Sequence, residues 1–304
     1  MPFATARTEP EPTGRLVEPV ETPGMLLHSV TSCMGTLAMI SVWGAHASAA
    51  VGEAADELDR LESLWSRFQP TSDVAMLNAA SGAWIEVSPE TAALVGTALA
   101  MTEATGGAFD ITLGSAARPA EVRGDTVRLP PGARLDLGGI GKGAAVQRVI
   151  DLLRRRGART ALVNLGRSSI GTLGTPPGRD QWRVAINCPT PPDEPIRLVE
   201  PVETPSWPVL TFGEGYLSTS GDEVPASGHT IDPATGEPSA SGARLATVLC
   251  DDGAHAEAWS TALLVLGTRG LPMAVAAGCE AVLMDHAGQL RRTPGLEQKE
   301  ASCG

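Results

Sequence analysis

The eight residues from Asp136 to Gly143 carry the clearest chemistry in this sequence. They read Asp-Leu-Gly-Gly-Ile-Gly-Lys-Gly, and a helix-like pattern follows from Ala144 to Arg155. Glycine lets a backbone approach a ligand closely, and the free N–H groups at the start of a helix bind anions. Lys142 adds a positive point charge. The loop therefore predicts a phosphate site, and this combination favours a nucleotide.

Two common phosphate-binding motifs do not match this loop. It lacks the Gly-x-x-x-x-Gly-Lys-Ser/Thr spacing of a Walker A motif, and its glycines do not follow the Gly-x-Gly-x-x-Gly order. No early βαβ unit surrounds them either. A glycine-rich turn before a helix is also a common structural connection, so the loop alone leaves both interpretations open.

Other segments are polar, and we do not expect them to belong to a buried core. They are Gly107–Asp110, Asn164–Gly166, the hydroxyl-rich loop Leu217–Gly221, and His229–Gly236. Glu257 and Thr261 stand four residues apart, which places a carboxylate and a hydroxyl on one helix face. Carboxylate, hydroxyl and carbonyl oxygens suit Mg²⁺ beside a pyrophosphate.

The elements that must position these residues alternate along the chain. Leu26–Val42 alternates as strands do, Ala47–Trp65 has apolar residues at helical spacing, and Ser88 caps a helix over Pro89–Thr105. The other predicted elements are helices Ala144–Arg156 and Ala254–Leu266, strands Thr160–Leu165, Trp182–Ile186, Val209–Thr211 and Ala246–Leu249, and a hairpin of Ala281–Met284 with Leu290–Thr293. Helices interleaved with long β connections predict a mixed α+β fold.

Composition excludes two classes of partner. The 304 residues carry a net charge of −12, and their longest basic run is Arg154–Arg156, so binding to duplex nucleic acid is not expected. No apolar run reaches the roughly 18–20 residues that span a bilayer, so no membrane anchor is expected in this chain. Residues 1–24 lack the order of a signal peptide. A cytoplasmic location is the default expectation.

The cysteines predict neither a metal knuckle nor a disulfide framework. There are five, at Cys33, Cys188, Cys250, Cys279 and Cys303, and no Cys-x-x-Cys pair occurs. Buried free thiols are the expectation.

A short segment occurs twice. Arg15–Pro23 reads Arg-Leu-Val-Glu-Pro-Val-Glu-Thr-Pro, and Arg197–Pro205 repeats it unchanged. It is too short and proline-rich for a packed repeat, so both copies are interpreted as surface segments, with a shared binding motif as the alternative. The expected organisation is a disordered tail at 1–24, one domain at 25–294 with a proline-rich insertion at 189–208, and a flexible tail at 295–304.

In combination, these segments resemble the ApbE family of FAD:protein FMN transferases, which move FMN from FAD to a threonine or serine of an acceptor protein. The matching pieces span roughly residues 25–267 in family order: Met34–Thr36, Ser66–Ser72, Gly107–Asp110, Asp136–Gly143, Asn164–Gly166, Ser218–Gly221, His229–Gly236 and Glu257–Thr261. The resemblance implies an ApbE-like, T-fold-related α+β fold of mixed sheets with packed helices in one compact unit.

The resemblance also implies roles for individual residues. His229 matches the general base, and Lys142 would stabilise charge on the pyrophosphate. Those matching the FAD site are Met34, Phe68, Ala108, Phe109, Asp110, Asp136, Lys142, Ser220, Gly221 and Ile231. Those matching the Mg²⁺ ligands are the carbonyl of Gly139 and the side chains of Glu257, Ser260 and Thr261.

The sequence departs from the family pattern at four places. Glu257 and Gln147 replace aspartates, Arg167-Ser168 replaces a Gly-Asp pair after Asn164-Leu-Gly166, and the segment between Asp110 and Asp136 is shorter. A longer carboxylate side chain matters because Mg²⁺ requires near-octahedral geometry at about 2.0–2.1 Å. Two alternatives therefore stay open, namely a divergent protein that binds a flavin or nucleotide without transferring it, and a structural or partner-binding module.

Local patterns alone support simpler interpretations of the same residues. His229 could bond a loop carbonyl, and Glu257 could be a favourable charge near the start of a helix. Phe68 and Met34 would be core residues.

Overall fold

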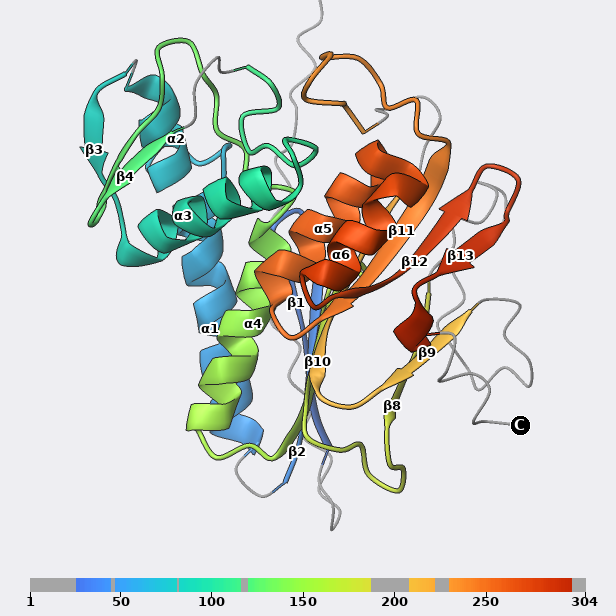
Figure 1. Ribbon diagram of the computed structural model, residues 1–304. Helices are drawn as coiled ribbons and strands as arrows, with labels where there is room; N and C mark the ends of the chain where they lie inside the picture. Colours follow the sequence, from blue (N-terminus) through green and yellow to red (C-terminus); the bar gives the residue numbers. More distant parts are fainter. Residues whose placement is uncertain are drawn as a thin grey trace, which may run out of the picture.

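An antiparallel eight-stranded sheet forms the centre of the computed structural model (Figure 1). The structure describes residues 26–44, 47–80, 82–115, 120–186, 208–221 and 230–296. In spatial order the strands are β1 (Leu26–Cys33), β2 (Thr36–Trp43), β6 (Thr160–Leu165), β7 (Ser169–Leu173), β10 (Gly215–Gly221), β11 (Ala243–Cys250), β12 (Glu280–Asp285) and β13 (Leu290–Arg292). With the helices described next, this confirms the predicted α+β class.

Three helices cover one face of this sheet. They are α1 (Ala47–Trp65), α4 (Gly141–Arg155) and α5 (Gly253–Leu266), and they lie side by side in Figure 1. Their apolar stripes are buried in the main core, with Leu58, Ile150 and Trp259 among the fully buried side chains. Burial of these stripes stabilises the layer and holds the first turns of α4 and α5 together.

The opposite face is partly covered by the antiparallel pair of β8 (Trp182–Ala185) and β9 (Val209–Phe212). It encloses a second, smaller core that contains Phe212, Leu217 and Val282. Because β7 and β10 are covered on both faces, all five residues of β7 are buried. This explains why β7 shows no alternation in the sequence.

A smaller lobe lies at the upper left of Figure 1. It contains α2 (Asp73–Ala79), α3 (Pro89–Ala104), and the sheet of β3 (Trp84–Glu86), β5 (Thr126–Arg128) and β4 (Glu121–Arg123). The short segments η1 (Gly267–Gly270) and α6 (Leu271–Ala276) follow α5.

One predicted loop is wrong. Leu217–Gly221 belongs to strand β10, and its hydroxyls bond partners on strand β11 and helix α5 rather than being exposed in a turn. Thr219 Oγ1 lies 2.9 Å from Thr247 Oγ1, and Ser218 is fully buried. A polar strand is stable here because ladder bonds satisfy its backbone and partner hydroxyls satisfy its side chains.

The expectation of free thiols is wrong for two cysteines. Cys250 and Cys279 form a disulfide between the end of β11 and the residue before β12. Leu249 pairs with Glu280, so the antiparallel register places these cysteines opposite each other, which their spacing in the sequence could not reveal. Cys33 is a free, buried thiol, and burial raises its pKa to about 12.

Loss of this disulfide is expected to lower the free energy of unfolding by about 2–4 kcal/mol, because it closes a long loop in the unfolded chain. The measurement is urea denaturation of the protein with and without a reductant. The double variant Cys250→Ser/Cys279→Ser is the control and should show the lower stability under both conditions. Recovery of the two cysteine peptides as free thiols from unreduced protein would disprove the pairing.

Several expectations fall outside the described residues. Both copies of the repeated segment, at Arg15–Pro23 and Arg197–Pro205, lie there, as do Cys188 and Cys303. The division into tails, domain and insertion stays a prediction. Across the described ranges, no helix is long and apolar enough to cross a membrane. The cytoplasmic location also stays a prediction, and disulfides are rare in that reducing compartment.

Candidate functional site

Helix α4 begins inside the glycine-lysine loop. Its first residue is Gly141, three residues before the predicted start, so Lys142 and Gly143 lie in its first turn. The N-cap residue, Ile140, makes no side-chain capping bond. The Gly141 N–H bonds the Leu137 carbonyl oxygen at 2.7 Å, whereas the Gly143 N–H takes its acceptor from another part of the chain.

Glu257 of α5 supplies such an acceptor. Its Oε2 accepts a 2.5 Å hydrogen bond from the Gly143 N–H, and its Oε1 lies 2.7 Å from Lys142 Nζ. The carboxylate is buried, so the lysine charge and the positive end of α4 offset its loss of hydration.

The capping is reciprocal. Gln147 of α4 accepts a 2.8 Å bond from the Gly253 N–H at the start of α5, and its amide donates to Asp252 at 3.2 Å. Asp252 in turn caps α5 by accepting from the His255 N–H at 2.9 Å. Gln147 and Glu257, which both depart from the family pattern, thus join the two helix starts.

Backbone contact between the two helices requires glycine. A Cβ on Gly143 would lie 2.0 Å from the carbonyl oxygen of Gly253, and a Cβ on Gly253 would lie 2.4 Å from that of Gly143. Any side chain at either position would push the helices apart and move Glu257 away from the α4 amides.

A cluster of hydroxyls adjoins Glu257 on α5 and β10. Ser220 Oγ lies 2.7 Å from Ser260 Oγ and 3.4 Å from Thr261 Oγ1. Ser260 also lies 3.4 Å from Ser218, a residue that the sequence motif contained but to which no role was assigned. The structure therefore brings Ser220 close to Ser260 and Thr261, and the roles assigned to these residues stay predictions.

Gly139 reaches the same cluster from the loop. A Cβ built on it would lie 3.4 Å from Thr261 Oγ1 and 3.2 Å from the ring of Phe109. Phe109 and Ala108 are buried, and the Phe109 ring packs against this loop.

The donor set here is oxygen-only. Gly139, Glu257, Ser260 and Thr261 offer one carboxylate, two hydroxyls and a carbonyl, while no cluster of three or more His, Cys, Asp or Glu in the described ranges could hold a metal. Mg²⁺ commonly binds one or two carboxylates together with substrate phosphates. Ser169, opposite Ser218 across β7 and β10, also has a buried hydroxyl with no partner among the described residues. These residues fit a hard cation shared with a phosphate.

A cleft of about 750 Å³ lies at the other end of the loop. Phe68 lines it with 80% of its surface exposed, so the alternative of a core role for Phe68 is wrong. Arg67 lies 4.7 Å above the Phe68 ring and forms a 2.5 Å ion pair with Asp136. Arg67 was missed in the sequence, although it directly precedes Phe68 in the motif. Arg134, also in the lining, adds a second cation.

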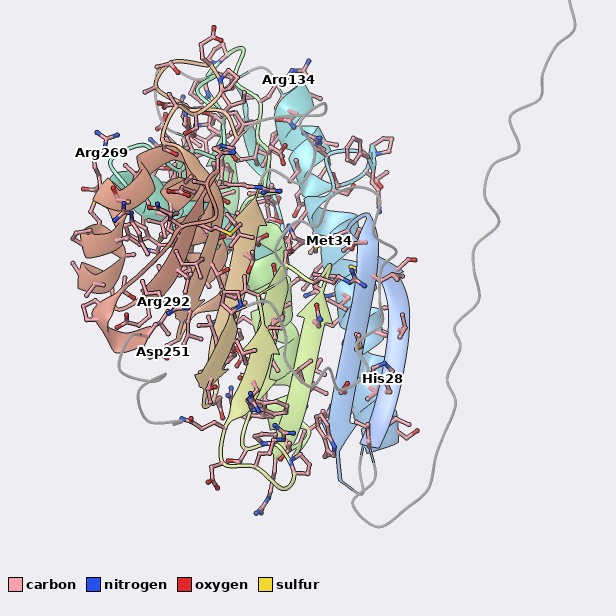
Figure 2. All side chains as sticks on the ribbon, turned by 90° about the vertical axis from the view of Figure 1, so that its right-hand side faces the viewer. His28, Met34, Arg134, Asp251, Arg269 and Arg292 are labelled. Carbon is pink, nitrogen blue, oxygen red and sulfur yellow. A yellow bond between two sulfur atoms is a disulfide. The ribbon has the colours of Figure 1, made fainter. Side chains whose placement is uncertain are left out.

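The other predicted residues that the structure describes lie in loops and at a strand end. Asp110 accepts bonds from Thr112 and Gly114, and Thr112 lines the cleft. Met34 lies in the β1–β2 turn with a φ of 51°, near the upper end of that hairpin in Figure 2. Gly221 ends β10, and Ile231 forms a β-bridge with Pro238. His229 lies outside the described residues.

Arg167 lies in the turn between β6 and β7. It is exposed, it has a φ of 60°, and its N–H donates to Asn164 Oδ1 at 3.0 Å. The side-chain bond from Asn164 holds this turn in a conformation in which glycine is more usual.

Comparison with known proteins gives consistent matches. The model of the ApbE family matches residues 34–126 and 117–283. The FAD:protein FMN transferase of Salmonella typhimurium is 27% identical over 78% of this chain and 77% of its own length, and that of Treponema pallidum is 28% identical over 77% of each.

Solved structures agree in fold. The ApbE protein of Thermotoga maritima superposes with a TM-score of 0.77 at 22% identity, covering 90% of this chain and 99% of its own. The flavin transferase ApbE from Vibrio cholerae gives the same TM-score and identity, covering 91% and 99%.

Proposed function

The chain belongs to the ApbE family, and from this we propose that it is an FAD:protein FMN transferase that moves FMN from FAD to a Thr or Ser hydroxyl of an acceptor protein. The observation that supports this most is the loop Asp136–Gly143. Asp136 lines a cleft with an exposed aromatic ring, and Lys142 meets Glu257 beside the hydroxyl cluster. FAD is an extended dinucleotide, so it suits a site that includes both the cleft at Asp136 and the hydroxyl cluster beside Lys142.

The proposed reaction is a phosphoryl-group substitution. The acceptor oxygen forms a bond to the FMN phosphorus, the pyrophosphate P–O bond breaks, and AMP leaves. His229 takes the proton of the acceptor hydroxyl, for which an imidazole with an unperturbed pKa near 6.5 is suited. Lys142 and the positive end of the α4 dipole stabilise negative charge on the pyrophosphate.

Mg²⁺ is the proposed metal. Glu257, Ser260, Thr261 and the Gly139 carbonyl would hold it, and it would supply charge neutralisation to the leaving pyrophosphate. Met34, Phe68, Ala108, Phe109, Asp110, Asp136, Ser220, Gly221 and Ile231 are the residues proposed to shape the FAD site.

One observation favours a second candidate, a flavin- or nucleotide-binding protein without transferase activity. Both oxygens of Glu257 are engaged by α4, one by Lys142 and one by the Gly143 amide. Because both of its oxygens already bond groups of α4, this carboxylate is less available to a metal.

One experiment separates the candidates. The protein is incubated with FAD, Mg²⁺ and an acceptor peptide that contains threonine, and flavin fluorescence of the peptide and released AMP are measured. Labelled peptide and equimolar AMP support the transferase. Tight FAD binding without label supports the binding protein, and the absence of flavin binding excludes both the transferase and a flavin-binding role.

The role of His229 is tested by substitution. His229→Ala is expected to lower the transfer rate by roughly a hundredfold, because the acceptor hydroxyl loses its base, while FAD affinity stays unchanged. Transfer is measured at saturating FAD, and affinity by fluorescence titration. A variant that transfers FMN at the wild-type rate would show that His229 is not the base.

A further inference from the structure

The ammonium of Lys142 lies between two groups that belong to different elements. Its Nζ is 2.7 Å from Glu257 Oε1 on α5 and 3.4 Å from the carbonyl oxygen of Gly138 in the loop. A cation at this position links the loop to α5 by bonding an oxygen of each.

Lys142 is the more exposed member of this ion pair. The side chain of Glu257 is 4% exposed, whereas that of Lys142 is 25% exposed. Because the ammonium already bonds Oε1, a divalent cation that binds this oxygen must compete with Lys142.

The proposed metal would link the same two elements. Its ligands are Glu257 on α5 and the carbonyl of Gly139, which directly follows Gly138 in the loop. Two cations in contact with one buried carboxylate repel each other strongly, and the second oxygen of Glu257 is already bound by the Gly143 amide.

We propose that Lys142 occupies the cation position of the metal-free site and competes with the divalent metal for Glu257. Binding of the metal displaces the ammonium, which becomes available to the substrate phosphates. In the metal-free protein, the Lys142 ammonium offsets the negative charge of the buried Glu257 carboxylate. This inference rests on the metal ligands of the proposed function, and it adds that metal binding and placement of Lys142 are a single coupled step.

The test is Mn²⁺ binding without FAD or acceptor, measured by electron paramagnetic resonance. Lys142→Gln removes the competing charge, and its Kd for Mn²⁺ is expected to be about tenfold lower than that of the wild type. A Kd equal to or above the wild-type value overturns the inference, as does failure of both proteins to bind Mn²⁺.

Two control variants isolate the competition. Lys142→Arg keeps a competing cation at this position, so its Mn²⁺ affinity should stay near that of the wild type. Arg148→Gln removes the same charge from a half-buried position later in α4 that pairs with Glu90, and it should also have little effect. If Arg148→Gln tightens Mn²⁺ binding as much as Lys142→Gln does, the effect is a general electrostatic one and the inference fails.

A second measurement uses the unaltered protein, in case Lys142→Gln does not fold. Saturating Mg²⁺ is expected to increase the rate at which an amine-reactive ester labels Lys142, measured by peptide mass spectrometry, because the ammonium leaves its ion pair. Unchanged or slower labelling overturns the inference. Neither measurement requires FMN transfer, so a failure of the proposed reaction is recognised separately.

Discussion

Replacement of Glu257 by Gln is expected to lower the rate of FMN transfer by about a thousandfold, with FAD binding changed much less. Glutamine keeps the shape of the side chain and can still accept from the Gly143 N–H, so the helix contact survives. What is lost is the one carboxylate among the proposed metal ligands, and with it most of the neutralisation of the pyrophosphate. Initial rates are measured across a range of Mg²⁺ concentrations.

Glu257→Asp is the matched control for this prediction. It restores the residue that is usual in the family and keeps the charge, but it is one methylene shorter and cannot reach both Lys142 and the α4 amide. Transfer should stay within about tenfold of wild type, while stability falls by about 1 kcal/mol through loss of the helix cap. If Glu257→Gln transfers FMN as fast as wild type at saturating Mg²⁺, Glu257 has no role in holding a catalytic metal.

A large loss of stability is expected for Gly143→Ala, which should lower the free energy of unfolding by about 3 kcal/mol. The new methyl group would lie 2.0 Å from the carbonyl oxygen of Gly253 and 3.0 Å from the Cβ of Glu257. Two backbones cannot yield as a flexible side chain can, so α4 and α5 must separate. Chemical denaturation monitored by circular dichroism measures the loss.

Gly52→Ala provides the control for helix propensity. Gly52 lies within α1, and a Cβ there meets nothing within 4 Å. This variant should be more stable by about 0.5–1 kcal/mol, because alanine favours the helix. If Gly143→Ala is as stable as Gly52→Ala, the close contact between the two helix starts does not exist in solution.

Much of the fold could be predicted because its signals are local. The helices at Ala47–Trp65 and Pro89–Thr105 were recognised within one residue, since helical spacing and the Ser88 cap involve residues three or four positions apart. The sequence did not predict strands that are buried on both faces or rich in hydroxyls, such as β7 and β10. Their stability comes from neighbours that are distant in the sequence.

The candidate site likewise has features that local sequence predicts and features that it does not. The order of its motifs along the chain was sufficient to indicate the family, and the Gly-Lys loop predicted an anion site. The exposure of Phe68 and its cation contact with Arg67 could not be predicted, because a single aromatic residue has the same local pattern in a core and at a cleft.

By itself, therefore, the sequence determined the fold class, the long helices and the residue types available for phosphate chemistry. Tertiary structure alone decided which of those residues meet. The Glu257 carboxylate bonds an amide 114 positions away, and Cys250 pairs with Cys279 across two strands. Such contacts depend on sheet register and on the glycine contact between α4 and α5, and they become definite only when the whole core is packed.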